Sequence, residues 1–184
     1  MKNSYWISPF SNTKDLEELF SELNKTKLHS LIDLELPLLN KILFFKNIFS
    51  VWKNKKRIKQ FLEKNKKRIT TAEAPPILGI GLRKILGVDY NIETEKGLMW
   101  YSSMIPSYIN KKTKRNLIKI KDKGKYTIGL GVIAKGVLSY EPLLSPKKLE
   151  KDLEFAKKSG FKKVCIFRLG GLNKDYMKVI SKFQ

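Results

Sequence analysis

Residues 125–172 constrain the fold of this chain more than any other stretch, because they predict strand, loop, helix and strand in succession. Tyr126–Ala134 is an apolar run of strand-forming residues, and Val164–Leu169 is a second one. Between the two runs, Ser145 offers an N-cap oxygen and Pro146 occupies the first helical position. Two apolar strands joined by a capped helix predict a βαβ unit, in which the strands pair in parallel.

The same alternation of strand and helix recurs along the rest of the chain. Apolar, β-rich runs predict strands at residues 4–8, 28–36, 68–74, 88–92 and 98–103. Apolar residues at helical spacing predict helices at residues 16–23, 38–65, 77–86 and 173–183. This repeated alternation predicts a single domain, residues 1–184, of the α/β class with a mostly parallel sheet.

Two architectures fit the alternation. The first is a (β/α) barrel-like fold, complete or incomplete. A complete eight-stranded barrel usually needs about 250 residues, whereas this chain has 184. A barrel would therefore need tight loops, lack a strand, or receive a strand from another chain. The second architecture is an open, doubly wound sheet with helices on both faces.

The chain is strongly basic, with a formal net charge of +21 at pH 7. A basic surface of this strength is typical of proteins that bind nucleic acid. Nearly all of the positive charge comes from lysine, however, and lysine is abundant throughout the chain. Compositional bias is therefore a second explanation, and enrichment in lysine and glutamate also suits a thermophile.

The sequence KNKKR occurs twice, eleven residues apart, near the end of the helix predicted at residues 38–65. Eleven residues are close to three helical turns, so both copies are expected on one helix face. The copies supply the candidate phosphate-binding residues Lys53, Lys55, Lys56, Arg57, Lys64, Lys66, Lys67 and Arg68. The alternative is an ordinary solvated face of a surface helix.

Carboxylates recur near the carboxyl ends of the predicted strands, where parallel α/β folds build their active sites. The four candidates are Asp33, Glu35, Glu73 and Glu141. Glu73 is the most informative, because an acidic residue among small and apolar neighbours is unfavourable to bury unless it is paired or used. Its alternative role is a buried ion pair, for instance with Arg168.

Aromatic residues accompany these carboxylates near the strand ends, namely Tyr90, Trp100 and Tyr101. Two carboxylates that face a cleft suit glycoside hydrolysis. One of them donates a proton to the leaving oxygen, and the other acts as nucleophile or activates water. The aromatic rings would then stack on sugar faces, and Arg168 would orient a carboxylate.

The order of the segments LIDLELP, TTAEAPP, MWYSSM, IGLGVIAKG and CIFRLGGL resembles that of sugar-hydrolase-type TIM barrels. The resemblance covers most of the chain from about residue 28 and lies in the style of the strand ends, without a specific family signature. It implies a glycosidase acting on a carbohydrate, with Glu73 and one of Asp33, Glu35 or Glu141 as the carboxylate pair. In the large retaining clan of these enzymes an Asn precedes the acid Glu, whereas Ala72 precedes Glu73 here.

His29 and Cys165 are the only residues of their kinds, so neither a His/Cys zinc site nor an internal disulfide is expected. His29 starts its predicted strand and Cys165 lies inside one, which predicts a satisfied histidine and a packing residue. We expect no metal and no cofactor, because the glycine patterns that bind nucleotides are incomplete. No apolar run or signal core suggests a membrane, so a cytoplasmic protein is expected.

Three functions therefore stay open. The first is hydrolysis of a glycosidic bond by paired carboxylates. The second is nucleic-acid binding through the two KNKKR segments. The third is a non-catalytic subunit or remnant of a barrel enzyme that needs a partner chain.

Overall fold

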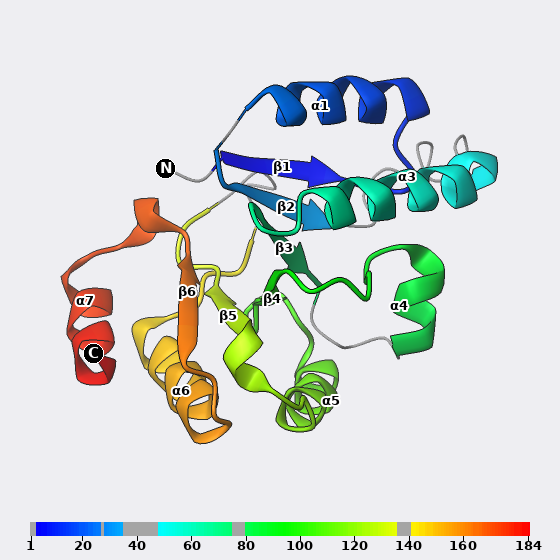
Figure 1. The fold of residues 1–184 in the computed structure, drawn as a ribbon. Helices are drawn as coiled ribbons and strands as arrows, with labels where there is room; N and C mark the ends of the chain where they lie inside the picture. The colour runs from blue at the N-terminus through cyan, green and yellow to red at the C-terminus, as the bar shows by residue number, and fades with distance from the viewer. Residues whose placement is uncertain (1–2, 27, 35–47, 75–79, 136–140) are drawn as a thin grey trace. The chain divides into compact units, whose positions relative to one another are not determined.

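The computed structural model describes residues 3–26, 28–34, 48–74, 80–135 and 141–184 (Figure 1). The chain divides into two compact units. The first unit consists of residues 1–74 and 78–96, and the second of residues 75–77 and 97–184. Each unit has its own strands, helices and buried hydrophobic cluster.

Parallel strands form the sheet of the first unit. They lie side by side in chain order, as β1 (Asn3–Ile7), β2 (Ser30–Leu34) and β3 (Ile69–Glu73). The register sets Asp33 beside Ala72 and Leu34 beside Glu73. Because successive side chains point to opposite faces of a strand, Leu34 and Glu73 share one face and Asp33 lies on the other.

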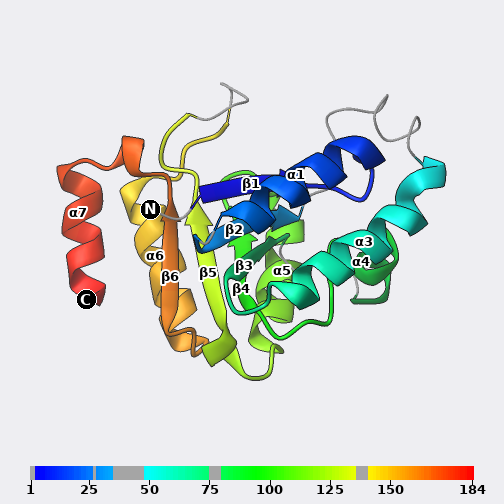
Figure 2. The same ribbon diagram turned by 45° about the horizontal axis from the view of Figure 1, so that its top comes forward.

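Helices cover one face of this sheet. Those that the structure describes are α1 (Thr13–Lys25), α3 (Val51–Lys64, after a 3-10 turn at Ile48–Ser50) and α4 (Ile80–Leu86). The Asn12 side chain caps α1 by accepting a hydrogen bond from the Lys14 N–H at 2.9 Å. Figure 2 shows α1 and α3 beside the strands, and the rings of Phe20 and Phe61 stack with their centroids 4.2 Å apart. These helices therefore bury the face that carries Leu34.

The second unit contains the later strands of the chain. They are β4 (Glu95–Trp100), β5 (Tyr126–Gly131) and β6 (Lys163–Phe167). The first two residues of β4, Glu95 and Lys96, belong to the first unit, and the rest of the strand belongs to the second. Strands β5 and β6 pair in parallel, with Gly129 beside Cys165.

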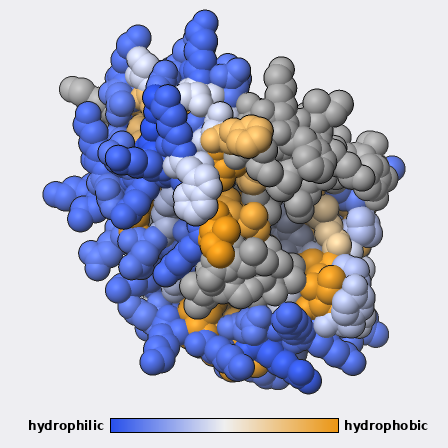
Figure 3. Space-filling view, turned by 90° about the vertical axis from the view of Figure 1, so that its right-hand side faces the viewer, coloured by the Kyte–Doolittle hydropathy of each residue, from blue (hydrophilic) through white to orange (hydrophobic). Residues whose placement is uncertain are grey.

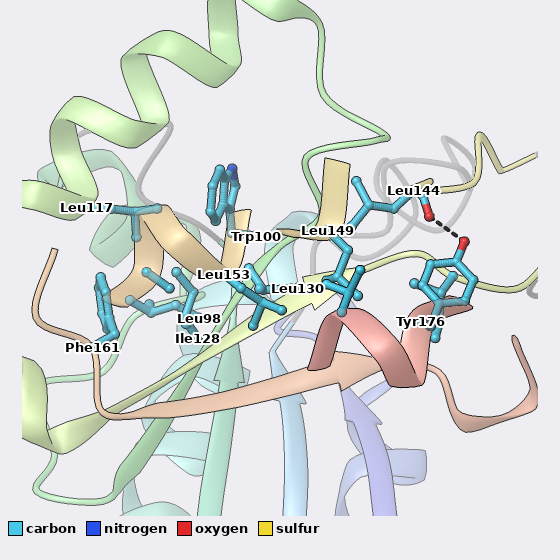
Figure 4. Packing of buried hydrophobic residues seen from close by; sticks show 13 residues of the cluster. Leu98, Trp100, Leu117, Ile128, Leu130, Leu144, Leu149, Leu153, Phe161 and Tyr176 are labelled. Carbon is cyan, nitrogen blue, oxygen red and sulfur yellow. Dashed lines mark hydrogen bonds between the residues drawn. The ribbon is translucent and has the colours of Figure 1, made fainter. Parts of the chain in front are cut away.

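A hydrophobic cluster joins these strands to their helices. The described helices are α5 (Ser107–Ile118), α6 (Pro146–Lys158) and α7 (Lys174–Ile180), with 3-10 turns at Lys123–Lys125, Leu169–Gly171 and Ser181–Phe183. As predicted, Ser145 caps α6 and Pro146 starts it. Figure 4 shows Leu130 of β5 and Leu149 of α6 in the cluster, and the Tyr176 hydroxyl donates to the Leu144 carbonyl at 2.5 Å.

The prediction of an α/β fold with parallel strands is confirmed. The described residues do not close a barrel, because β1 pairs with β2 alone and β6 with β5 alone. A doubly wound sheet needs helices on both faces. In contrast, α1 and α3 share one face of their strands, and α5 and α6 share one face of theirs.

The structure corrects three local predictions. Residues 88–92 form no strand. Phe49 and Trp52 are 94% and 72% exposed, although helical spacing predicted both on a buried face. The reason is that the buried stripe of α3 runs through Val51, Ile58 and Phe61, whereas Phe49 lies before the helix and Trp52 lies on another face of it. Cys165 is exposed rather than packed in a core, because β6 is an edge strand.

Part of the predicted helix, residues 38–47, lies outside the described residues, as does Glu35. In the part of the chain that the structure describes, no helix is both long enough and apolar enough to cross a membrane.

Candidate functional site

Glu73 ends strand β3, and its side chain is only 3% exposed. Arg83 on α4 donates a hydrogen bond from Nη2 to Glu73 Oε2 at 2.8 Å. Lys96, near the start of β4, places Nζ 2.8 Å from Oε1. The hydroxyl of Thr71 donates to the same oxygen at 3.4 Å. Glu73 therefore forms the buried ion pair that was its alternative role, but with Arg83 and Lys96 rather than with Arg168.

Asp89 completes a group of four buried charges around Glu73. Its carboxylate oxygens lie 3.4 Å from Lys96 Nζ and 3.9 Å from Arg83 Nη1. The side chains of the four residues are all less than 15% exposed, with values of 3, 7, 13 and 14%. We call Glu73, Arg83, Asp89 and Lys96 the buried charge cluster. Two cations and two anions balance one another in it, which is what a site largely without water requires.

Burial raises the pKa of the Glu73 carboxyl, and it is the largest influence on that group. The nearby cations Lys96 and Arg83 lower this pKa, and the like charge of Asp89 raises it. The cluster links β3, α4, the segment after α4 and β4. Its geometry accounts for a carboxylate among small and apolar neighbours without any substrate.

Asp33, the other candidate carboxylate that the structure describes in the first unit, does not share a site with Glu73. Asp33 lies on the opposite face of the sheet, because the register aligns it with Ala72 rather than with Glu73. Glu141 belongs to the second unit and is buried there. Glu35 is outside the described residues. A carboxylate pair made of Asp33 and Glu73 at one cleft is therefore not what the structure contains.

Two of the three aromatic residues predicted to contact a sugar are packed inside the units. Trp100 is 0% exposed, and its Nε1–H donates to the Asn110 side-chain oxygen at 2.8 Å. Tyr90 is 7% exposed and lies in the hydrophobic cluster of the first unit, where burial raises its pKa. Because neither ring reaches the surface, the prediction that they stack on a sugar is corrected.

The remaining predicted contacts lie in the second unit. The Tyr101 ring is half-buried and stacks on Phe167, with centroids 5.5 Å apart. Arg168 is half-buried and donates a hydrogen bond to the backbone carbonyl of Lys135. These two residues hold a strand end and a loop in place within their unit.

Sequence reasoning missed a second buried carboxylate, Asp152 of α6. The Ser102 hydroxyl donates a hydrogen bond to it, and Lys114 Nζ lies 3.8 Å from its other oxygen. Burial raises the pKa of Asp152, whereas the Ser102 hydrogen bond and the charges of Lys114 and Lys148 lower it. In the sequence Asp152 follows the helical stripe position of Leu149 by three residues, which is the signal that marks it as inward-facing.

The eight basic residues of the two KNKKR segments divide into two groups. Three of them are held by contacts within the first unit. Lys55 Nζ donates to the Ile85 carbonyl at 2.8 Å, and burial lowers the pKa of Lys55. Arg57 pairs with Glu17 at 2.7 Å, and Arg68 donates to a backbone carbonyl just after α1. These three side chains are therefore committed to the fold.

The other five are exposed, and none of them makes an ion pair with a described residue. They are Lys53, Lys56, Lys64, Lys66 and Lys67. We call these five residues the α3 lysines. The first three lie on α3 and the last two in the turn that follows it. The two KNKKR copies do not share one helix face as predicted, because α3 ends at Lys64 and the second copy continues into the turn.

A groove of about 450 Å³ lies between α1 and α3 beside the α3 lysines. Phe20 and Phe61 line it together with polar residues, among which are Glu17, Arg57 and Lys64. Arg57 Nη1 is buried and has no hydrogen-bond acceptor among the residues that the structure describes. The groove therefore combines two aromatic rings with charges of both signs, of which Arg57 and Glu17 form an ion pair.

Figure 3 shows one face of the molecule, on which hydrophilic side chains dominate and hydrophobic ones form small patches. No cluster of His, Cys, Asp and Glu in the described ranges is arranged to hold a metal ion. Comparison of the chain with protein-family models, with curated proteins and with solved structures finds no match.

Proposed function

We propose that the chain binds nucleic acid through α3 and the turn that follows it. The observation that carries this proposal is the exposure of the α3 lysines, which make no ion pair with any residue that the structure describes. Phosphate groups attract lysine ammonium groups without regard to base sequence, and this attraction supplies most of non-specific nucleic-acid binding. The ligand class is therefore a phosphate backbone rather than a small anion.

The charge pattern of α3 differs from that of an ordinary solvated helix. Glu63 is the only acidic residue between positions 51 and 68, and it pairs with Lys59 at 3.5 Å. In contrast, α6 interleaves its lysines with Glu150 and Glu154. Intermixed charges of both signs are typical of a surface selected for solubility, whereas a single-sign stripe produces a field that attracts a polyanion.

Aromatic exposure next to the lysines supports the same proposal. Trp52 is 72% exposed in the first turn of α3, and Lys55 Nζ lies 4.6 Å from the centre of its ring. Exposed rings beside basic residues are the arrangement on which nucleic-acid bases stack. The groove between α1 and α3 lies beside these residues and is lined in part by Lys64, one of the α3 lysines.

The test replaces Lys53, Lys56 and Lys64 of α3 together by Gln, which keeps helix propensity and removes charge. We expect the affinity for a fluorescently labelled oligonucleotide, measured by anisotropy at about 50 mM salt, to fall by at least tenfold, because each lost phosphate contact weakens binding. Circular dichroism should show an unchanged fold, since all three side chains are exposed.

The matched control replaces Lys147, Lys151 and Lys158 of α6 by Gln, which removes the same charge from another exposed helix. We expect this variant to bind nearly as tightly as the unmodified chain. Equal losses in the two triple variants would show that only the total charge matters, and the proposed site on α3 would then be wrong.

Hydrolysis of a glycosidic bond stays a prediction of the sequence, as does a barrel subunit that needs a partner chain. The strand-end carboxylates support the first, and the edge strands β1 and β6 support the second. The hydrolysis prediction now pairs Glu73 with Glu35 or Glu141, because Asp33 and Glu73 lie on opposite faces of the sheet. Turnover of a chromogenic glycoside that is lost in a folded Glu73→Gln variant would favour this function, and unchanged turnover would remove Glu73 from it.

A further inference from the structure

We infer that α5, in the second unit, is a second nucleic-acid site that takes a single strand and stacks a base on Tyr108. The site goes beyond the one proposed on α3, since it uses a different helix in a different unit. It rests on the exposed face of α5, and its support comes from the charge, the aromatic ring and the spacing found there.

The charged residues on the exposed face of α5 are all basic. Basic residues recur along it at positions that helical geometry brings to one side, namely Lys111, Lys112, Arg115 and Lys119. All four are exposed, and none of them makes an ion pair with a residue in the described part of the chain. The helix contains no acidic residue. Nothing described on α5 therefore neutralises this charge.

Tyr108 lies in the first turn of the helix and is 75% exposed. It precedes Lys112 by four residues and Arg115 by seven, so the ring and these two cations share one stripe. Tyrosine combines a flat apolar ring with a polar hydroxyl, so an exposed tyrosine can present its ring face to a ligand. Stacking on the flat face of a base is a use that the neighbouring cations support.

One basic residue of α5, Lys114, contacts the core of its own unit and therefore differs from the others. Lys114 lies 3.8 Å from Asp152 and places Nζ over the rings of Trp100 and Phe155, at 5.2 and 4.9 Å. This residue faces the core of the unit. The remaining cations of the helix make no ion pair or ring contact with a residue that the structure describes.

The arrangement on α5 repeats that on α3. Each helix presents an exposed aromatic ring, an asparagine two residues later that hydrogen-bonds into its own unit, and basic residues three, four and seven positions after the ring. The two sets are Trp52, Asn54, Lys55, Lys56 and Lys59, and Tyr108, Asn110, Lys111, Lys112 and Arg115. The repeat is one of spacing: on α3, Lys55 donates to the Ile85 carbonyl and Lys59 pairs with Glu63, so only Lys56 corresponds to the cations of α5 that make no ion pair with a described residue.

A single strand fits this face better than a duplex does. The basic residues from Lys112 to Lys119 extend over about 10 Å of helix, so they reach only a few successive phosphates. Stacking on Tyr108 requires a base whose flat face is accessible. In a duplex that face is covered by the neighbouring base pairs, whereas in a single strand it is free.

The experiment uses the full chain that already carries Lys53→Gln, Lys56→Gln and Lys64→Gln, so that the remaining binding reports on α5. The probes are a labelled single strand, as DNA and as RNA, the same strand without bases, and the corresponding duplex. We expect the strand with bases to bind more tightly than the abasic strand and the duplex. Comparison of DNA with RNA shows which single strand is preferred.

Tyr108→Ala should weaken binding of the base-bearing strand by about tenfold, which corresponds to the loss of one stacked base. It should leave binding of the abasic strand unchanged. Tyr108→Phe keeps the ring and should keep the affinity. Replacing Lys112, Arg115 and Lys119 by Gln should reduce the slope of log affinity against log salt by about 2, because single strands lose about 0.7 per phosphate contact.

Three outcomes would overturn the inference. The first is equal affinity for the base-bearing and abasic strands, and the second is no effect of Tyr108→Ala. The third is complete loss of binding when only Lys53, Lys56 and Lys64 have been replaced by Gln. If the α3 substitutions leave binding intact while the α5 substitutions abolish it, the α3 proposal fails and the α5 inference stands.

Discussion

Glu73 is held between two cations, and these partners determine what a substitution at this position does. Removing its charge leaves Arg83 and Lys96 buried with Asp89 as their only anion in the buried charge cluster. An uncompensated buried charge is strongly unfavourable. We therefore expect Glu73→Gln to lower the free energy of unfolding by about 3 kcal/mol, measured by urea denaturation.

The control for this prediction is Glu63→Gln, which also removes one carboxylate. Glu63 is half exposed on α3 and pairs only with Lys59 of its own helix. Exposed pairs of this kind contribute little, so the expected change is within about 0.5 kcal/mol. If Glu73→Gln proves as mild as the control, the buried charge cluster does not stabilise the first unit.

The buried carboxyl of Asp152 should make the free energy of unfolding depend on pH in a specific way. Because burial raises its pKa above the ordinary value of 3.8, the folded chain binds this proton more tightly than the unfolded chain does. The stability from the protonated form is present at low pH and is lost as the pH rises through the folded-state pKa. Relative to Asp152→Asn, the unmodified chain should therefore become less stable as the pH rises above 3.8.

Urea denaturation of both proteins at a series of pH values checks this prediction. The difference between the two free energies of unfolding isolates Asp152, because Glu73 and every other titrating group are common to both chains. A difference that stays constant with pH, or that grows in favour of the unmodified chain, would contradict the role given to burial.

At the residue scale, the sequence predicted which carboxylate is unusual but not what surrounds it. Glu73 stands out because its neighbours are small and apolar, and that signal is local. Its partners Arg83 and Lys96 lie ten and twenty-three residues further along the chain. Only the arrangement of α4 and β4 brings them to it, so Arg168 was an equally reasonable expectation.

Among the elements, the end of α6 offers a clean test of backbone conformation. Gly160 has a φ of +87°, and a Cβ added there would meet only a flexible lysine side chain at 3.7 Å. The penalty for Ala is therefore almost entirely conformational. We expect Gly160→Ala to lower the free energy of unfolding by about 1 kcal/mol, measured by thermal or urea denaturation.

Gly124→Ala is the matched control. A Cβ at Gly124 meets nothing within 4 Å, and the residue lies outside the left-handed region. The expected effect is neutral or slightly stabilising, because Ala restricts the unfolded chain. Equal losses at the two glycines would mean that the left-handed helix end is not what Gly160 provides.

Helix starts were predictable because caps are local. Ser145 and Pro146 mark the start of α6 in the sequence and in the structure. Which residues of a helix are buried was not predictable in the same way. Helical spacing placed Trp52 with the core residues, but the core of α3 is formed by Ile58, Phe61 and Leu62. Spacing tells which residues share a face and not where neighbouring elements cover it.

At the scale of the whole molecule, alternation of strands and helices was sufficient to predict the parallel α/β class. Barrel closure was not predictable, because it depends on pairing between strands far apart in the chain. The sequence of a single strand does not indicate whether that pairing occurs. The division into two units, each with its own hydrophobic cluster, likewise has no composition break in the sequence.

The lysines of the molecule differ in what they contact. Lysines that serve the fold, such as Lys55, Lys96 and Lys114, are engaged by carbonyls, carboxylates or rings. Those on the outer faces of α3 and α5 are exposed and make no ion pair with a described residue, apart from Lys59. Other exposed lysines, such as Lys147, Lys151 and Lys174, lie on other helices, so what distinguishes α3 and α5 is the exposed aromatic ring beside their basic residues.

The most direct test of nucleic-acid binding is the salt dependence of affinity for a labelled single strand, measured by anisotropy between about 50 and about 200 mM salt. If the five α3 lysines contact phosphates, log affinity should fall against log salt with a slope of about −3.5. The Lys53, Lys56 and Lys64 triple variant should show a slope shallower by about 2. A flat dependence, or the same slope in both proteins, would contradict the account.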